Sequence, residues 1–102
     1  MTHANQYKGK PLTLKMIKGF CIRSRVILRR LLNGAATRTE LDYIVESPST
    51  PTYIHLMRDK GVVIHTTLYF YRDSRGIEGW RGKYFLGWES RGIVAAALGG
   101  AS

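Results

Sequence analysis

The chain has 102 residues, of which 44% are hydrophobic, and this length suits a single domain with a small core. Its 16 Lys and Arg residues outnumber 7 Asp and Glu residues, and the net charge of +9 predicts an anionic partner. The composition argues against three classes of protein. A disulfide-stabilised protein is excluded because one cysteine permits no internal disulfide, and a metal-cluster protein is not expected because the three histidines are scattered. A membrane-spanning protein is not expected because no apolar run could span a bilayer.

The chain is expected to divide into an arm, one domain and a tail. Residues 1–12 are polar and lack the apolar centre of a signal peptide, so we expect a flexible basic arm there. The domain is predicted over residues 13–98, and a disordered tail over residues 99–102. The lone Cys21 indicates a reducing cytoplasm, and as a small apolar side chain it is expected in the core.

The first predicted helical region runs from Thr13 to Leu32. Its apolar residues recur near the helical period of 3.6, and Gly19 weakens the middle. The region is therefore either one helix, or a short helix followed by a longer one from about Ile22. The pair Asn33-Gly34 supplies residues that end helices in the left-handed conformation.

The second predicted helix runs from about Arg38 to Glu46. It follows the sequence TRTE (residues 37–40), which matches the capping box. In this motif the Thr37 hydroxyl accepts a hydrogen bond from the third helical amide, and the Glu40 carboxylate accepts one from the Thr37 amide. The apolar residues that follow have the spacings of three and four that are typical of a helix.

A proline-rich segment, SPSTP (residues 47–51), separates the second helix from the third. Proline disfavours helical geometry in the residue before it but suits the first turn of a helix, where its missing N–H would be unpaired. We therefore expect Pro48 to end the second helix, and Thr50 to cap a third helix that Pro51 opens. Alternatively, Ser47 and Pro48 begin that helix one turn earlier.

Beyond Gly61, which is predicted to end the third helix, apolar residues alternate with a period of two. Residues 62–71 therefore predict a β-strand, and the Gly- and Arg-rich residues 72–82 predict a hairpin tip. Residues 83–88 predict the return strand, and residues 89–98 predict a closing helix.

The succession of a long helix, two short helices and a hairpin with a basic tip resembles the winged helix-turn-helix DNA-binding domain. The most specific part is TYIHLMRDKGVVI (residues 52–64), which looks like the end of a recognition helix that continues through a turn into the first wing strand. The resemblance covers about residues 22–88 and implies an α+β fold: a three-helix core, then a two-stranded β-hairpin wing and a short C-terminal helix. It further implies that the third helix enters the major groove and that the hairpin lies along the flanking backbone.

The resemblance also implies which residues contact double-stranded DNA. The start of the third helix would lie nearest the bases, the second helix would cross the backbone, and the hairpin would contact phosphates. The third helix has no Arg, Asn or Gln in its first turns, the types that read a base with two hydrogen bonds, so base reading is expected to be weak. The expected DNA-binding residues are Ser49, Thr50, Thr52, Tyr53, His55 and Arg58 of the third helix, Arg38 of the second, and Arg72, Arg75, Arg81 and Lys83 of the hairpin.

These features predict a small transcriptional regulator that prefers particular duplex sequences and associates with the nucleoid. Two alternatives remain open: a winged helix module that binds an acidic protein surface, and an RNA or single-strand binder that uses the hairpin aromatics. Those aromatics are expected mostly to pack within the fold, with Trp80 in the tip as the exception. A homodimer through the first or last helix is expected, since the apolar stretch near Leu98 lacks an obvious cover. No Ser, His and Asp spacing forms a catalytic set, so no enzymatic activity is expected. No cofactor, metal, small-molecule ligand or membrane is expected as a partner either.

Overall fold

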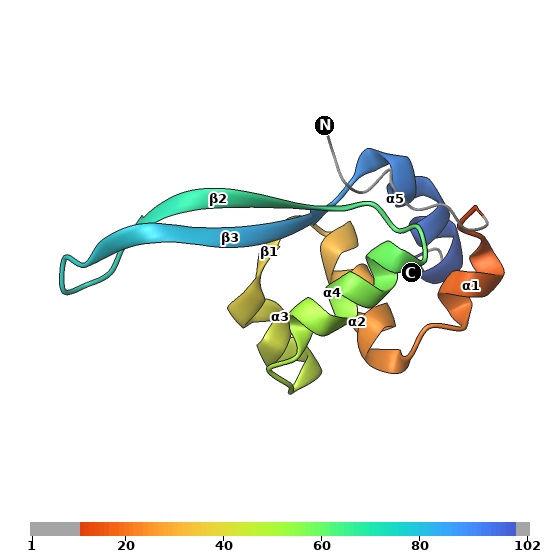
Figure 1. The fold of residues 1–102 in the computed structure, drawn as a ribbon, viewed down its shortest axis with the longest axis horizontal. Coiled ribbons are helices and arrows are strands. Elements are labelled where there is room, and N and C mark those ends of the chain that lie inside the picture. The colour runs from red at the N-terminus through yellow and green to blue at the C-terminus, as the bar shows by residue number, and fades with distance from the viewer. Residues whose placement is uncertain (1–10, 100–102) are drawn as a thin grey trace.

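Five α-helices and three strands make up most of the described part of the chain, residues 11–99 of this computed structural model. The helices gather at one end of the molecule, and a long hairpin projects from them (Figure 1). The prediction of an α+β fold is therefore confirmed, while most of the expected arm and tail lies outside the described residues. In chain order, the elements are α1 Leu14–Lys18, α2 Ile22–Leu32, β1 Ala36–Thr37, α3 Arg38–Val45, α4 Thr50–Asp59, β2 Ile64–Arg72, β3 Glu78–Leu86 and α5 Trp88–Val94, followed by a π-helical turn, Ala95–Gly99.

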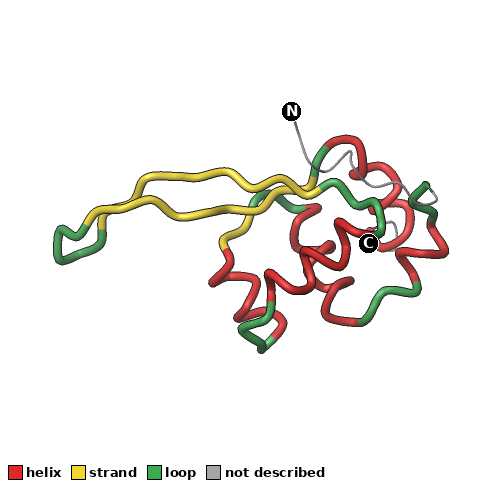
Figure 2. Tube along the Cα trace, in the orientation of Figure 1, coloured by secondary structure: helices red, strands yellow, loops and turns green. Residues whose placement is uncertain are grey.

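The three strands form one antiparallel sheet in the order β1-β3-β2. β1 has no counterpart among the predicted elements, and it pairs Ala36 with Tyr84 and Thr37 with Lys83 near the base of the hairpin. Beyond this base, β2 and β3 pair with each other alone and extend away from the helices, as Figure 2 shows. The extents of the molecule, 47 × 33 × 21 Å, reflect this projection.

The core lies between the helices and the base of the hairpin. Ile64 of β2 and Leu86 of β3 pair directly across the sheet, and both side chains are buried. Burial of large apolar side chains is the dominant favourable term in folding, so this cluster anchors the hairpin to the helices. The cluster comprises Ile17, Ile27, Leu28, Leu31, Ala36, Leu41, Val45, Ile54, Met57, Val62, Ile64, Leu86, Val94 and Leu98.

Several helix boundaries lie where the sequence predicts them. Thr37 Oγ1 accepts a hydrogen bond from the Glu40 amide at 3.1 Å, and Glu40 Oε1 accepts one from the Thr37 amide at 2.8 Å. Both halves of the capping box at the start of α3 are therefore confirmed. Gly34 after α2 and Gly61 after α4 have φ of 132° and 101°, a region that glycine adopts without a steric penalty. The break at Gly19 separates α1 from α2, so the first helical region is two helices.

The start of α4 differs from the prediction. Thr50 is the first residue of the helix instead of its cap, and its side chain is fully buried. Ser49 occupies the cap position without a side-chain hydrogen bond. Asp42 of α3 takes over the capping role, because its Oδ1 accepts a hydrogen bond from the Thr50 amide at 3.2 Å. Pro51 lies in the first turn, as predicted.

The hairpin has a longer return strand and a shorter tip than predicted, while the first strand begins two residues later than predicted, at Ile64. The connection comprises residues 73–77, so Arg81 belongs to β3 together with Lys83, which is predicted there. Gly79 explains the difference, because it looks like a turn residue in the sequence but pairs with Tyr71 within the sheet. A Cβ placed on Gly79 would lie 3.0 Å from the Tyr71 ring, so the glycine leaves this ring room to lie across the neighbouring strand.

Two expectations about apolar residues are wrong. Cys21 is exposed, because it lies at the surface just before α2 instead of in the core. The stretch near Leu98 is covered: Leu98 is buried in the core cluster, and the π-helical turn packs against α1 and α2. This cover removes the reason for expecting a dimer through the last helix.

Candidate nucleic-acid interface

The projecting hairpin presents a cationic face. The register of β2 and β3 places Tyr69, Tyr71, Arg81 and Lys83 on the same side of the sheet. Arg81 lies over the Tyr71 ring, 4.2 Å from its centroid, and Lys83 lies over the Tyr69 ring at 4.7 Å. Within residues 11–99, neither cation forms an ion pair with a carboxylate. These four residues, the cationic face, therefore hold two positive charges without an ion-pair partner against aromatic rings, an arrangement that cation–π attraction stabilises.

The tip of the hairpin is organised by Asp73. Its Oδ1 accepts hydrogen bonds from the amides of Arg75 and Ile77, both at 2.9 Å, and its Oδ2 lies 3.2 Å from the Arg75 guanidinium. The bond from the Ile77 amide, followed by those from Arg75, lowers the pKa of Asp73 below its ordinary value, so this carboxylate stays charged. Arg72 pairs with Glu78 where the strands enter the tip. The two predicted cations nearest the tip thus form ion pairs with neighbouring acids, unlike those of the cationic face.

The outward face of α4 carries two of the residues predicted to read DNA. Thr52 and His55 are exposed there, and His55 Nε2 lies 3.3 Å from Asp59 Oδ2 one turn later. Leu56 is exposed on the same helix. The exposed part of α4 therefore offers hydroxyl and imidazole groups beside a carboxylate and an apolar side chain, and it lacks the residue types that make bidentate base contacts.

Three other predicted residues of α4 have structural contacts. The Thr50 side chain is buried, so its hydroxyl does not reach the surface. Tyr53 is half-buried and packs against the core cluster. Arg58 donates a hydrogen bond from Nε to the Ile64 carbonyl at 2.8 Å, which ties the last turn of α4 to the start of β2. These residues hold α4 in place against the sheet.

Arg38 lies at the first position of α3 with its side chain 56% exposed. Its Nε lies 3.3 Å from Asp42 Oδ2, and its Nη2 donates a hydrogen bond to the Pro48 carbonyl at 3.1 Å. Because Asp42 also accepts from the Thr50 amide, one carboxylate links both helices and the turn between them. Arg38 therefore shapes the turn between α3 and α4 and still presents part of its guanidinium to solvent.

Sequence reasoning missed the two tyrosines of the cationic face and the capping role of Asp42. A signal for the tyrosines is present, since Tyr69 and Tyr71 alternate on one strand as Arg81 and Lys83 do on the other. Placing the two pairs opposite each other requires the register of the two strands. The predicted tip, residues 72–82, includes Arg81 and therefore gives the wrong register. No comparable local signal marks Asp42, because its partner amide lies eight residues later.

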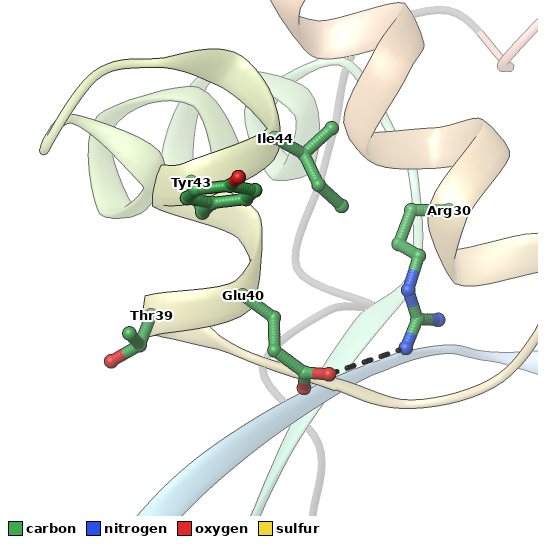
Figure 3. Close-up of a pocket in the computed structure, with 5 residues that line it drawn as sticks. All are labelled: Arg30, Thr39, Glu40, Tyr43 and Ile44. Carbon is green, nitrogen blue, oxygen red and sulfur yellow. Dashed lines mark ion pairs between the residues drawn. The ribbon is translucent and has the colours of Figure 1, made fainter.

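A shallow depression of about 400 Å³ lies beside α3. Figure 3 shows the residues that line it, Arg30, Thr39, Glu40, Tyr43 and Ile44. Arg30 Nη2 lies 3.7 Å from Glu40 Oε2, so the two charged groups of the lining offset each other. Tyr43 is mostly exposed, and the depression offers no unpaired charge with which to hold a ligand.

Two other kinds of feature, a metal site and a membrane-spanning helix, are absent from the part of the chain that the structure describes. Over residues 11–99, no group of three or more His, Cys, Asp or Glu side chains is arranged to hold a metal ion. Among the helices of the same residues, none has the length and apolar character that crossing a membrane requires.

Comparisons with known proteins gave no match: no family model, no curated protein and no solved structure matches the chain.

Proposed function

We propose that this chain is a winged helix domain that binds double-stranded DNA and acts as a small transcriptional regulator. The element order supports this architecture: α2, α3 and α4 are followed by the β2–β3 hairpin, and a short turn joins α3 to α4. In winged helix domains the third helix of this set lies in the major groove and the hairpin contacts the backbone. The net charge of +9 supports an anionic partner, because releasing counterions from DNA favours a basic protein.

The observation that carries the proposal is the cationic face. Arg81 and Lys83 are held over tyrosine rings, and neither forms an ion pair among the described residues. Because the rings order these long side chains before binding, less conformational entropy is lost when they contact phosphates. The hairpin projects well beyond the helices (Figure 1), so this face extends the reach of the protein along a duplex.

Base reading contributes less to this function than phosphate contact does. The exposed groups of α4 that were predicted to read bases, Thr52 and His55, make single hydrogen bonds. Single bonds discriminate between bases less than the bidentate contacts of Arg, Asn or Gln. We therefore expect affinity that falls steeply with salt and a modest preference among duplex sequences.

The test measures duplex binding of Arg81→Ala and Lys83→Ala by fluorescence anisotropy at several salt concentrations. Each variant is expected to bind all duplexes more weakly, and the slope of log affinity against log salt should decrease by about 1 per lost contact. The matched control is Lys18→Ala, which removes one exposed charge from α1, at the end of the molecule away from the hairpin tip (Figure 1). This control separates a lost phosphate contact from a general loss of net charge.

The same assay distinguishes the alternatives. Thr52→Ala and His55→Ala are expected to change which duplex is preferred and to leave the salt slope unchanged. Equal binding by the parent, Arg81→Ala and Lys83→Ala at every salt concentration would contradict the cationic face as a DNA contact. Tighter binding to RNA or single strands would favour a second candidate function, that of an RNA or single-strand binder. The exposed Trp80 supports this candidate, because aromatic rings stack on unpaired bases. Absence of binding to any nucleic acid would favour an acidic protein partner.

A further inference from the structure

The hairpin has a second face, opposite the cationic one, that is apolar. Phe70 pairs directly with Trp80, and their rings meet edge to face with centroids 5.5 Å apart. Leu68 lies on the same side two residues before Phe70, opposite Gly82, which adds no side chain to cover it. These three residues, the apolar face, are exposed: Leu68 by 65%, Phe70 by 52% and Trp80 by 66%.

The apolar face continues the inner face of the sheet beyond the helices. At the base of the hairpin the same side carries Ile64 and Leu86, which are buried in the core. Further out, beyond the pair Thr66 and Tyr84, the same side carries Leu68, Phe70 and Trp80, and more than half of each of these three residues is exposed. A two-stranded hairpin is marginally stable in water unless one of its faces packs against another element. The projecting part of this hairpin would therefore be stabilised by a partner on its apolar face.

The charges of the hairpin are kept away from the apolar face. Arg81 and Lys83 lie on the opposite side, and Arg72, which shares the apolar side, is paired with Glu78 at its outer end. The three side chains of the apolar face thus carry no charge in a chain of net charge +9, and the nearest cation on their inner side is Arg58, which donates to Thr66 Oγ1 at 3.0 Å. An acidic protein or a nucleic acid would gain little electrostatic attraction from these uncharged side chains, whereas a second copy of the chain can place its own uncharged side chains against them.

We propose that the apolar face binds the apolar face of a second copy and forms a two-fold symmetric dimer. Two-fold interfaces are the commonest in homo-oligomers, and they require a patch that is complementary to itself. A face of uncharged apolar side chains meets that requirement. The two hairpins would stack face to face at about 10 Å, the usual spacing of packed sheets, with Phe70 and Trp80 of each copy between them.

The area of the apolar face sets the strength of this dimer. Because an aromatic side chain presents about 150–250 Å², the exposed parts of Leu68, Phe70 and Trp80 amount to roughly 350 Å² per copy. Two copies would bury roughly 700 Å² from these side chains, less than the roughly 1,000 Å² of a specific stable interface. The adjoining backbone adds to this area, so we expect a weak, reversible dimer that dissociates in the micromolar range.

The two tryptophans of the chain allow a direct test. In a Trp88→Phe variant the sole tryptophan is Trp80, and its emission is expected to shift to the blue as the protein concentration rises from about 1 μM to about 500 μM without DNA. In the converse variant, Trp80→Phe, the exposed Trp88 of α5 is expected to show no shift. Sedimentation equilibrium over the same concentrations should give a dimer for the parent.

A leucine substitution identifies the surface. Leu68→Thr in the Trp88→Phe background keeps a strand-forming side chain, and it is expected to weaken dimerisation by about tenfold or more and to abolish the blue shift. Leu56→Thr, the same change at a half-exposed leucine of α4, should leave the dimer unchanged. Added salt should maintain or strengthen the dimer by screening repulsion between two chains of charge +9, the reverse of its effect on DNA binding.

A chain that remains monomeric up to about 500 μM would overturn the proposal. A dimer in which the Trp80 emission does not move would also overturn it, as would equal effects of Leu68→Thr and Leu56→Thr, because the dimer would then use another surface. Circular dichroism checks that both variants retain the secondary structure of the parent. None of these measurements contains nucleic acid, so their outcome is independent of the proposed DNA binding.

Discussion

Removing the Thr37 hydroxyl tests how much the capping box at the start of α3 stabilises this fold. The hydroxyl accepts a hydrogen bond from the Glu40 amide at 3.1 Å, and the Glu40 carboxylate accepts one from the Thr37 amide at 2.8 Å. Thr37→Ala removes the first bond directly. The second bond is expected to weaken with it, because the two bonds hold the first turn of the helix in one arrangement.

The expected loss is about 1 kcal/mol of unfolding free energy, the usual cost of replacing a threonine cap by alanine. For a domain of about 90 residues, this loss corresponds to a decrease of about 4–8 °C in Tm. The Glu40 side chain is 51% exposed, so water replaces part of the lost bonding. We therefore expect a loss near the middle of the range observed for helix caps, well below about 2 kcal/mol.

Thr39→Ala provides the matched control for this measurement. Thr39 is exposed in the first turn of α3 and has no side-chain hydrogen bond to any residue from 11 to 99. Alanine is the better helix former, so this variant should be as stable as the parent or more stable by a few tenths of a kcal/mol. Chemical denaturation followed by circular dichroism compares the two variants. Equal midpoints for Thr37→Ala and Thr39→Ala would refute the capping argument.

Glu40 adds a pH dependence to the same prediction. The hydrogen bond from the Thr37 backbone lowers the pKa of Glu40 below its ordinary value of 4.5. A carboxylate whose pKa is lowered by folding stabilises the folded state above its unfolded pKa, and this contribution is lost as the pH falls through the folded pKa. The stability difference between the parent and Glu40→Gln should therefore be constant near neutral pH and shrink below pH 4.5. A difference that persists unchanged at about pH 3 would contradict this assignment.

Two further positions test the backbone and the core. Gly61 has φ of 101°, so Gly61→Ala is expected to lower the unfolding free energy by more than about 1 kcal/mol. Gly92 is an exposed helical glycine with open space around it, so Gly92→Ala should raise the unfolding free energy by up to about 1 kcal/mol. Similar denaturation midpoints for these two variants would place the end of α4 elsewhere. The Thr50 hydroxyl is buried without a hydrogen-bond partner among the described residues, so Thr50→Val is expected to raise the unfolding free energy by about 1 kcal/mol without changing DNA affinity. A less stable Thr50→Val protein would show that the hydroxyl has a partner in solution.

The sequence by itself determined the local features of this protein. The capping box at Thr37 and the helix end at Gly61 involve residues within a few positions of one another, so their chemistry can be read along the chain. The alternation in residues 62–71 is equally local, and the strand that it predicts is present from Ile64 onward. The excess of positive charge is also a property of the sequence, whereas the position of the cations that lack an ion pair is not.

Contacts between distant segments were decided by the tertiary structure. Gly79 resembles a turn residue, yet it lies within β3 because Tyr71 packs across it from the neighbouring strand. Arg58 resembles a free cation on an exposed helix, but it donates to the Ile64 carbonyl, and Thr50 is buried beneath a cap that Asp42 supplies from another helix. Strand register and packing between segments therefore decide which cations lack an ion pair and which face of the hairpin is exposed. Both bring together residues that are far apart in the sequence, so no local sequence pattern predicts them.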